Sequence, residues 1–182
     1  MIKVVAFDLL NVLCHKNNIE LDEIENNLKI LIENSISDSD YLINARKYVT
    51  KDSILMYMTE NLINKLYEVK DSLIFKKIKE KNPNIKLVII TNSITYVRNF
   101  VGESFDVNYL DDLIIISETP VINKKEDLYY YLSKKYNVDL KNILFVISKE
   151  KETMNEKINT LRVDNESDIY EMIEEYLNNK NT

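Results

Sequence analysis

Short apolar runs alternate along the chain with segments that have helical periodicity. The runs are rich in Val and Ile and lack regular polar positions, which is typical of parallel strands that are buried on both faces. They predict five strands, at residues 3–7, 86–90, 113–116, 143–147 and 160–163, the last of them the weakest.

Segments with a helical pattern lie between these strands. Residues 71–81 precede the second strand, residues 125–136 precede the fourth, and residues 168–177 close the chain, with Ser167 as the expected N-cap. A strand-then-helix order builds parallel sheets, because each helix returns the chain to the same edge of the sheet. The pattern therefore predicts an α/β fold with a Rossmann-like parallel sheet and helices on both faces.

The interval 15–70 departs from this order, because it has helical periodicity and no convincing strand. Ser37 begins a polar break that has the character of a helix start. We interpret 15–70 as a small helical cap insertion in a core domain made of 1–14 and 71–182. Ligands of open parallel sheets bind beyond the carboxyl ends of the strands, and an insertion leaving that edge is placed to cover a site. The apolar positions at helical spacing are Leu21, Ile24, Leu28 and Leu31, then Ile54, Met58, Leu62 and Leu66.

Length and cysteine usage limit the class of protein. The chain has 182 residues, of which 45% are hydrophobic, which suits one core domain with a modest insertion. No apolar run approaches the roughly 20 residues of a membrane span, and the start of the chain lacks the organisation of a signal peptide. Cys14 is the only cysteine, which excludes intramolecular disulfides and cysteine-based zinc sites. We expect a cytoplasmic protein that does not bind a membrane.

Charge and glycine content exclude further classes. The net charge of −6 and the pI near 5.0 weigh against a nucleic-acid-binding protein. The lysine pairs at 76–77 and 134–135 are expected on solvated helix faces. Only one glycine occurs in the chain, so neither a G-x-G-x-x-G fingerprint nor a P-loop is present.

Polar motifs follow the predicted strands at their carboxyl ends. Because these ends meet at one edge of a parallel sheet, their side chains are expected to lie close together. The motifs are Phe7-Asp8-Leu9-Leu10-Asn11-Val12 after the first strand, Thr91-Asn92-Ser93 after the second, Asn123-Lys124-Lys125 before the fourth, and Ser148-Lys149-Glu150-Lys151-Glu152 after the fourth.

With these motifs the whole chain resembles the capped subgroup of the haloacid-dehalogenase-like (HAD) hydrolases. The first motif is similar to a Phe-Asp-Leu-Gly-Asn-Val-Leu variant found among sugar-phosphate phosphatases of that superfamily. The resemblance implies that a carboxylate attacks phosphorus and forms an aspartyl-phosphate, which water then hydrolyses. It also implies that Mg²⁺ and a lysine offset the repulsion between the two anions, and that a hydroxyl holds the phosphoryl oxygens.

The early motifs match the family pattern in part. The resemblance gives Asp8 the role of nucleophile and gives Thr91 and Asn92 the role of phosphate ligands. Leu10 stands at the general acid/base position and cannot transfer a proton; some relatives, including the dehalogenases, also lack this acid. Asn11 replaces the usual glycine and is the next most tolerant residue of a left-handed backbone.

The later motifs depart further from the family. The lysine position falls on Asn123, and Lys124, one residue later, is the candidate for a surviving cation. Ser148 stands where a metal-binding Asp is expected, and Glu152 falls on the second acidic position. Asp8 with Glu152 therefore predicts a weakened Mg²⁺ site.

Each candidate also has a purely structural interpretation. Asp8 and Thr91 can serve as turn formers at strand ends, Lys124 can point into solvent, and Glu152 can be a surface carboxylate at a helix start. Cys14 is expected in the core. His15 follows the first loop and is a remote candidate for a substitute proton carrier.

Two functions compete, and a third is weaker. The first is a phosphohydrolase of low or altered activity, acting on a small phosphorylated metabolite through Asp8. The alternative is a catalytically inactive HAD-like protein that binds a ligand or a partner protein, which the residues at 10, 123 and 148 favour. Carbon–halogen hydrolysis needs a halide-holding arginine, and Arg46 is the only candidate in the cap. A phosphorylation-receiver domain is set aside, because its phosphorylated Asp lies on a later strand. The oligomeric state is left open.

Overall fold

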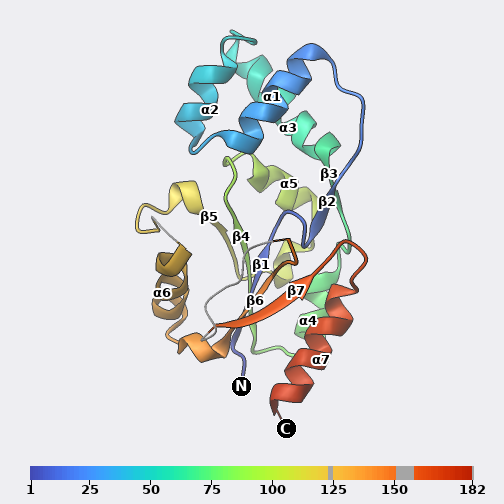
Figure 1. Cartoon of the computed structure of the whole chain (residues 1–182), viewed down its shortest axis with the longest axis vertical. Helices are drawn as coiled ribbons and strands as arrows, with labels where there is room; N and C mark the ends of the chain where they lie inside the picture. The colour runs from blue at the N-terminus through green and yellow to red at the C-terminus, as the bar shows by residue number, and fades with distance from the viewer. Residues whose placement is uncertain (123–124, 151–157, 182) are drawn as a thin grey trace.

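The structure, a computed structural model, describes residues 1–122, 125–150 and 158–181. Its main sheet has five parallel strands in the order β5-β4-β1-β6-β7 (Figure 1). The predicted α/β class is confirmed, and each predicted strand is found within one residue of its expected bounds. The strands are β1 (Val4–Asp8), β4 (Lys86–Thr91), β5 (Asp112–Ile115), β6 (Ile143–Ser148) and β7 (Asn159–Val163).

Helices cover both faces of this sheet. Helix α6 (Lys125–Tyr136) lies on one face, while α4 (Ile74–Lys81) and α7 (Ile169–Asn181) lie on the other (Figure 1). Helix α5 (Val97–Ser104) connects β4 to β5 and packs into the same core as α4 and α7. Alternating strand residues therefore point into two separate cores, which explains why the strand sequences are apolar throughout.

Two details of the helices differ from the prediction. Helix α5 was not predicted, because its apolar stripe is confined to an eight-residue helix. The N-cap of α7 is Asp168, whose carboxylate accepts a hydrogen bond from the Glu171 backbone N–H at 3.0 Å. The predicted cap, Ser167, instead donates its hydroxyl to Asp164 at 2.7 Å.

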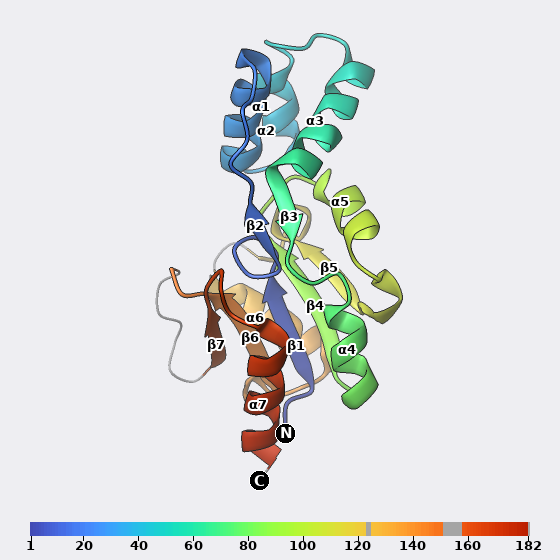
Figure 2. The ribbon, with the colours of Figure 1, turned by 90° about the vertical axis from the view of Figure 1, so that its right-hand side faces the viewer.

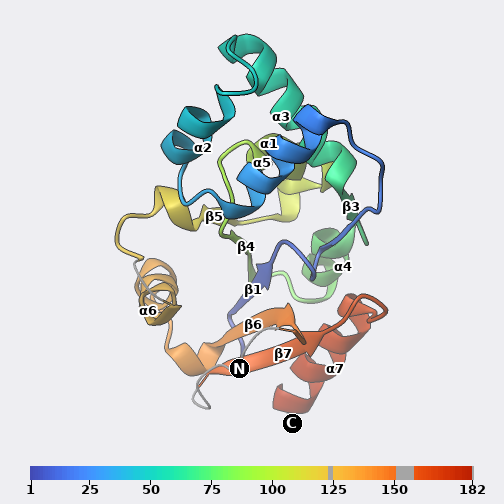
Figure 3. The same cartoon turned by 45° about the horizontal axis from the view of Figure 1, so that its top comes forward.

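The interval 15–70 contains helices α1 (Glu23–Asn34), α2 (Asp38–Ala45) and α3 (Asp52–Leu66). They lie beyond the end of the sheet toward which β1 points, and both chain termini lie at the opposite end (Figures 2 and 3). Ser37 caps α2 as predicted, since its hydroxyl accepts from the Asp40 backbone N–H. The predicted stripe is displaced on α3, where Ile54 is 47% exposed and Leu55 is fully buried.

Two short strands that the sequence pattern did not predict connect these helices to the sheet. Strands β2 (Cys14–Lys16) and β3 (Tyr67–Val69) form an antiparallel pair (Figure 2). Three residues are too few to show a period, which is why the pattern missed them. Among the described residues, none of the helices combines the length and apolar character needed to cross a bilayer.

Candidate functional site

Asp8 and Thr91 end two neighbouring strands of the sheet. In the β1–β4 register Asp8 lies opposite Ile90, and Thr91 is the next residue of β4. On the other side of β1, Phe7 lies opposite Val146, so the end of β6 flanks Asp8 as well. The Asp8 side chain is half-buried and Thr91 is 6% exposed. Parallel pairing thus brings a carboxylate and a hydroxyl to the same edge, as the sequence predicted.

The loop after Asp8 is a tight turn centred on Asn11. This residue has a φ of 64°, in the left-handed region that asparagine tolerates better than most residues. The Leu13 backbone N–H donates to the Leu9 carbonyl, and the Asn11 N–H donates to the Cys14 carbonyl. Leu10 is half-buried in this turn and packs against the main core. The turn therefore leads directly from β1 into β2 and leaves no acid two residues after Asp8.

The loop after Thr91 is tied to the helices of the interval 15–70. The Thr95 backbone N–H and hydroxyl both donate to the Asp38 carboxylate at the start of α2, the former at 2.8 Å. The Tyr41 and Tyr96 rings meet edge to face, with centroids 6.0 Å apart. Asn92 is exposed beside this junction. These contacts hold α2 next to the strand end that carries Thr91.

The end of β6 carries a neutral residue. Ser148 is 4% exposed, and its hydroxyl accepts from the Glu150 backbone N–H at 3.3 Å. The Lys149 backbone N–H donates to the Val163 carbonyl at 2.8 Å, which pairs the ends of β6 and β7. The strand end next to Asp8 therefore offers a buried hydroxyl where a carboxylate was expected.

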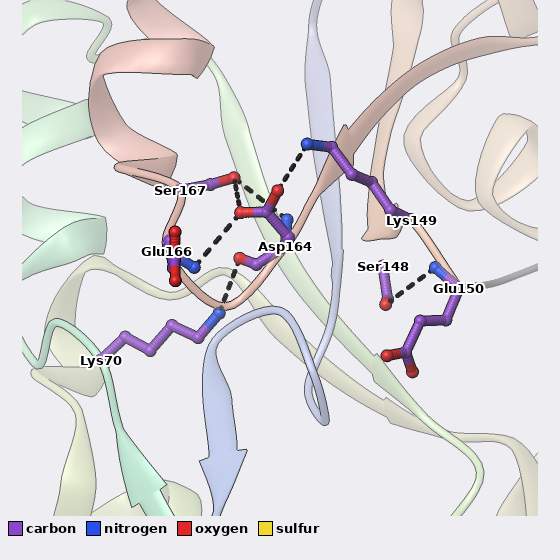
Figure 4. A network of polar contacts seen from close by, with 7 residues as sticks. All are labelled: Lys70, Ser148, Lys149, Glu150, Asp164, Glu166 and Ser167. Carbon is purple, nitrogen blue, oxygen red and sulfur yellow. Dashed lines mark hydrogen bonds and ion pairs between the residues drawn. The ribbon is translucent and has the colours of Figure 1, made fainter.

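A polar network lies at the end of β7 (Figure 4). The Asp164 carboxylate accepts hydrogen bonds from the side chains of Lys149 and Ser167 and from the Glu166 backbone N–H. Lys70 donates to the Asp164 carbonyl at 3.1 Å, which links the network to the chain after β3. Beside it is a pocket of about 310 Å³, lined by Asn11, Ser148, Lys149, Glu150, Asp164, Asn165 and Glu166.

This network predicts a loss of stability in acid. The hydrogen bond from Lys149, followed by that from Ser167, holds the pKa of Asp164 well below its usual range. A depressed folded-state pKa stabilises the protein above the unfolded value of about 3.9, and the stability is lost as the pH falls further. Asp164→Asn is therefore expected to lower the melting temperature at pH 7, and the gap to the native chain should narrow progressively as the pH falls below about 4. Thermal unfolding across pH measures this.

Asp139→Asn is the control for that prediction, because Asp139 is 75% exposed and lies 3.6 Å from Lys141 in a loose surface pair. It is expected to change the melting temperature little at any pH. A gap between the native chain and Asp164→Asn that stayed constant from pH 7 to pH 3 would contradict the assignment.

The described residues do not by themselves form a magnesium site. Ser148 occupies the strand end where a second carboxylate was expected, and its hydroxyl is already engaged by the backbone. Within residues 1–122, 125–150 and 158–181 no group of three His, Cys, Asp or Glu side chains could hold a metal ion. Of the two predicted ligands, Asp8 is described and Glu152 lies outside the described residues.

The structure brings some of the predicted residues together. Asp8, Thr91 and Asn92 gather at the ends of β1 and β4, while Lys124, like Glu152, lies outside the described residues. Cys14 is fully buried as expected, and burial raises the pKa of its thiol to about 12, so the thiol stays protonated at neutral pH. His15 is paired in register with Glu68, with Nε2 3.4 Å from the carboxylate.

Tyr129 is a buried polar residue near this site that the sequence motifs did not identify. It is 4% exposed on α6 and meets Phe145 of β6 edge to face, with centroids 5.0 Å apart. Among the described residues its hydroxyl has no hydrogen-bond partner. Burial raises the pKa of Tyr129 to about 12, and the charges of Glu126 and Asp8 add to that shift. The sequence signal that could have identified Tyr129 is the presence of a tyrosine on the buried face of a helix that packs against the sheet.

Comparison with known proteins gives a result from structure alone. No family model matches the sequence, and no curated protein matches it. A predicted HAD-like family hydrolase from Porphyromonas gingivalis superposes with a TM-score of 0.68 at 16% identity, covering 97% of this chain and 98% of that one. A HAD family enzyme from Bacteroides thetaiotaomicron, in complex with magnesium and inorganic phosphate, gives 0.64 at 13% identity and covers 94% and 99% of the two chains.

A third similar structure is an L-2-haloacid dehalogenase, with a TM-score of 0.51 at 11% identity over 80% of this chain and 77% of that one. The similarity thus extends over nearly all of this chain in the first two structures, and over about four-fifths of it in the third. The chain has the fold of the HAD-like hydrolases, as its strand-end motifs predicted.

Proposed function

We propose that the chain is a phosphohydrolase of low or altered activity that acts on a small phosphorylated metabolite through Asp8. The observation that carries the proposal is the position of Asp8 and Thr91 at the neighbouring ends of β1 and β4, next to helix α2. The magnesium and inorganic phosphate bound to the Bacteroides thetaiotaomicron enzyme agree with a phosphorylated substrate.

The reaction follows from these two side chains. An Asp8 carboxylate oxygen attacks phosphorus, the bond from phosphorus to the leaving oxygen breaks, and the leaving group departs with the electron pair. Water then attacks the phosphorus of the aspartyl-phosphate, which releases inorganic phosphate and regenerates Asp8. The Thr91 hydroxyl donates to a phosphoryl oxygen in both steps. Lys124 is the proposed cation of the site.

Leu10 determines which substrates this site can process. A hydrocarbon side chain cannot protonate the departing oxygen, so the leaving group has to be stable as an anion. Aryl and acyl phosphates meet that condition, whereas simple alkyl phosphates do not. The low activity that we propose is therefore restricted to substrates with a good leaving group.

A second candidate is a non-catalytic binding protein. The buried neutral Ser148 beside Asp8 favours it, because it removes a carboxylate from the strand end where a metal ion would bind. Dehalogenation is less favoured. Arg46, its only halide-holding candidate, is held by the exposed Asp52 carboxylate through two bonds of 2.9 Å.

Phosphate release tests the choice between the two candidates. The native chain is incubated with an aryl phosphate, an acyl phosphate and a panel of sugar phosphates, with Mg²⁺ and separately with a chelator. We expect release above the Asp8→Asn background from the aryl and acyl phosphates. If no substrate is turned over above that background, the phosphohydrolase proposal fails and the binding protein takes its place.

Restoring an acid at position 10 is expected to widen the substrate range. In Leu10→Asp the new carboxyl can protonate a poor leaving group, a contribution of about 10²-fold or more. Alkyl phosphates should therefore gain about 10²-fold in kcat/KM, while aryl phosphates change little. Leu10→Asn is the matched control, since it has the same size and polarity without an acid. Equal rates for the two variants on alkyl phosphates would refute the role of this position.

A further inference from the structure

A pocket of about 500 Å³ lies at the end of the sheet opposite the candidate site. Lys3, which precedes β1, and Lys86, the first residue of β4, both line it, whereas Asp8 and Thr91 close the same two strands at their other ends. Both chain termini lie at this end of the molecule (Figure 2). The volume is within the range of small-molecule sites. The pocket is therefore separate from the candidate site, and no step of the proposed reaction uses it.

Hydrocarbon side chains from several elements line this pocket and form its apolar wall. They come from the start of β1, the turn before β4, the segment after α6, and helix α7: Ile2, Val4, Ile85, Val138 and Leu177. All of them except Val138 are buried, so packing fixes their positions. The Lys86 backbone N–H donates to the Lys3 carbonyl at 2.8 Å, and Asn82 of the turn donates its side-chain N–H to Glu174 of α7, also at 2.8 Å. The pocket is thus preformed, and a ligand would have little of it to order.

The charged side chains that line the pocket are all lysines. They are Lys3, Lys81 and Lys86, and among the described residues no Asp or Glu lines it. This local excess of positive charge contrasts with the net charge of −6 of the whole chain. An anion is therefore the charge class that the pocket complements.

Carboxylates outside the pocket neutralise only part of this charge. Asp111 lies 2.8 Å from the ammonium group of Lys86 and 2.7 Å from that of Lys79, so one carboxylate serves two lysines. Glu174 lies 3.5 Å from Lys81, in a long ion pair. Positive charge therefore remains at the pocket after both of these carboxylates are counted.

Lys3 is the lining lysine whose charge is not neutralised. Its side chain is exposed, and it forms no ion pair with any residue that the structure describes. A single ammonium group beside an apolar wall matches a monoanion with a hydrocarbon body. A carboxylate fits that description better than a phosphate dianion, which would need a second unpaired cation.

We propose that this pocket binds a small hydrophobic carboxylic acid in its ionised form, with the carboxylate at Lys3 and the hydrocarbon against the apolar wall. The ammonium group supplies a charge-assisted hydrogen bond, and the hydrocarbon removes apolar surface from water. The inference does not depend on the proposed activity of Asp8. The opposite interpretation is a solvated groove whose lysines only keep the chain soluble.

An NMR titration with octanoate tests the location of the site. The labelled chain is expected to show saturable amide shifts at residues 2–4, 84–86 and 136–138, and none at 8–11 or 91–95. Hexanoate should bind about tenfold more weakly, because each methylene that is removed from an apolar contact weakens binding about fourfold. If no saturable shift occurs at the pocket, or if the shifts gather at 8–11 and 91–95, the inference is wrong.

Lys3→Gln tests the contribution of charge. It is expected to weaken octanoate binding about tenfold and to leave the binding of octanol, which has the same chain without a charge, unchanged. Lys141→Gln is the matched control, because Lys141 precedes the residue whose carbonyl accepts from the Lys3 backbone N–H, is 79% exposed and does not line the pocket. It should keep the octanoate affinity within about twofold. Equal affinity of the two variants for octanoate overturns the inference, as does octanol binding as tightly as octanoate.

Asp8→Asn separates this pocket from the candidate site. Asp8 ends β1 at the other edge of the sheet, so the variant is expected to bind octanoate with the affinity of the native chain. A loss of octanoate binding in Asp8→Asn would place the ligand at the strand ends and contradict the inference. This comparison holds whether or not the native chain releases phosphate, so the two proposals can fail independently.

Discussion

Asp8→Asn is expected to reduce phosphate release by about 10³-fold or more, the largest effect predicted for the site. An amide matches the shape of the carboxylate but is not a nucleophile, so the covalent route closes. Asp8 is half-buried at the end of β1, and its backbone pairs with β4. The substitution leaves this pairing intact, so the loss should occur without unfolding. Initial rates and thermal unfolding of the two chains measure both effects.

Thr91→Val gives a graded comparison for that result. It keeps the branched shape at the end of β4 and removes only the hydroxyl, which is the proposed donor to the phosphoryl group. We expect a loss of about 10²-fold, smaller than the loss at Asp8, because the nucleophile remains. If the native chain and Asp8→Asn released phosphate at the same rate, the turnover would come from a group other than Asp8.

Phe75→Ala is expected to lower the free energy of unfolding by about 3–5 kcal/mol, the largest effect on stability. Phe75 is fully buried on α4, where its ring lies 5.7 Å from that of Phe7 on β1 and 5.2 Å from that of Phe105 after α5. Removing the ring leaves a cavity between three elements, and these elements cannot move together to fill it. Since a domain of this kind has about 5–15 kcal/mol in total, much of the stability would be lost. Urea unfolding measures the change.

Leu73→Ala is the control for this prediction, because Leu73 caps the same helix and is 47% exposed. It is expected to change the free energy of unfolding by about 0.5 kcal/mol or less. A similar loss in both variants would mean that helix propensity, and not the aromatic cluster, sets the stability of α4.

The strands and α6 were predictable because their signals are local and repeated. Strands β1, β4 and β6 are apolar at nearly every position, since both of their faces are buried, and α6 was found at its predicted bounds. Strands β2 and β3 were not predictable, because each is three residues long and is defined by its pairing with the other. The N-cap of α7 was misplaced by one residue, because two neighbouring polar side chains compete for the same role and tertiary contacts decide between them.

The residues of the candidate site also divide into those that the sequence predicts and those that it does not. Asp8 and Thr91 follow apolar strands directly, so a sequence pattern places them at a common edge. Tyr129 becomes notable only when burial, the ring contact with Phe145 and the position of Asp8 are known together. The network around Asp164 joins residues from β3 onwards to the end of β7, a separation in sequence that no local pattern spans.

The fold does not select the chemistry. Similar structures include both a HAD enzyme that binds inorganic phosphate and an L-2-haloacid dehalogenase, at 13% and 11% identity. What distinguishes the possible reactions in this chain is the set of side chains at the strand ends. A carboxylate beside a hydroxyl supports phosphoryl transfer, while the hydrocarbon at position 10 restricts the leaving group.

Trapping the covalent intermediate tests directly whether Asp8 is the nucleophile. The native chain is mixed with an aryl phosphate, quenched in acid within one turnover, and digested for mass spectrometry. We expect a phosphoryl group on the peptide that carries Asp8, released by hydroxylamine and lacking in Asp8→Asn. Turnover of the aryl phosphate with no phosphoryl group on Asp8 at any quench time would contradict it.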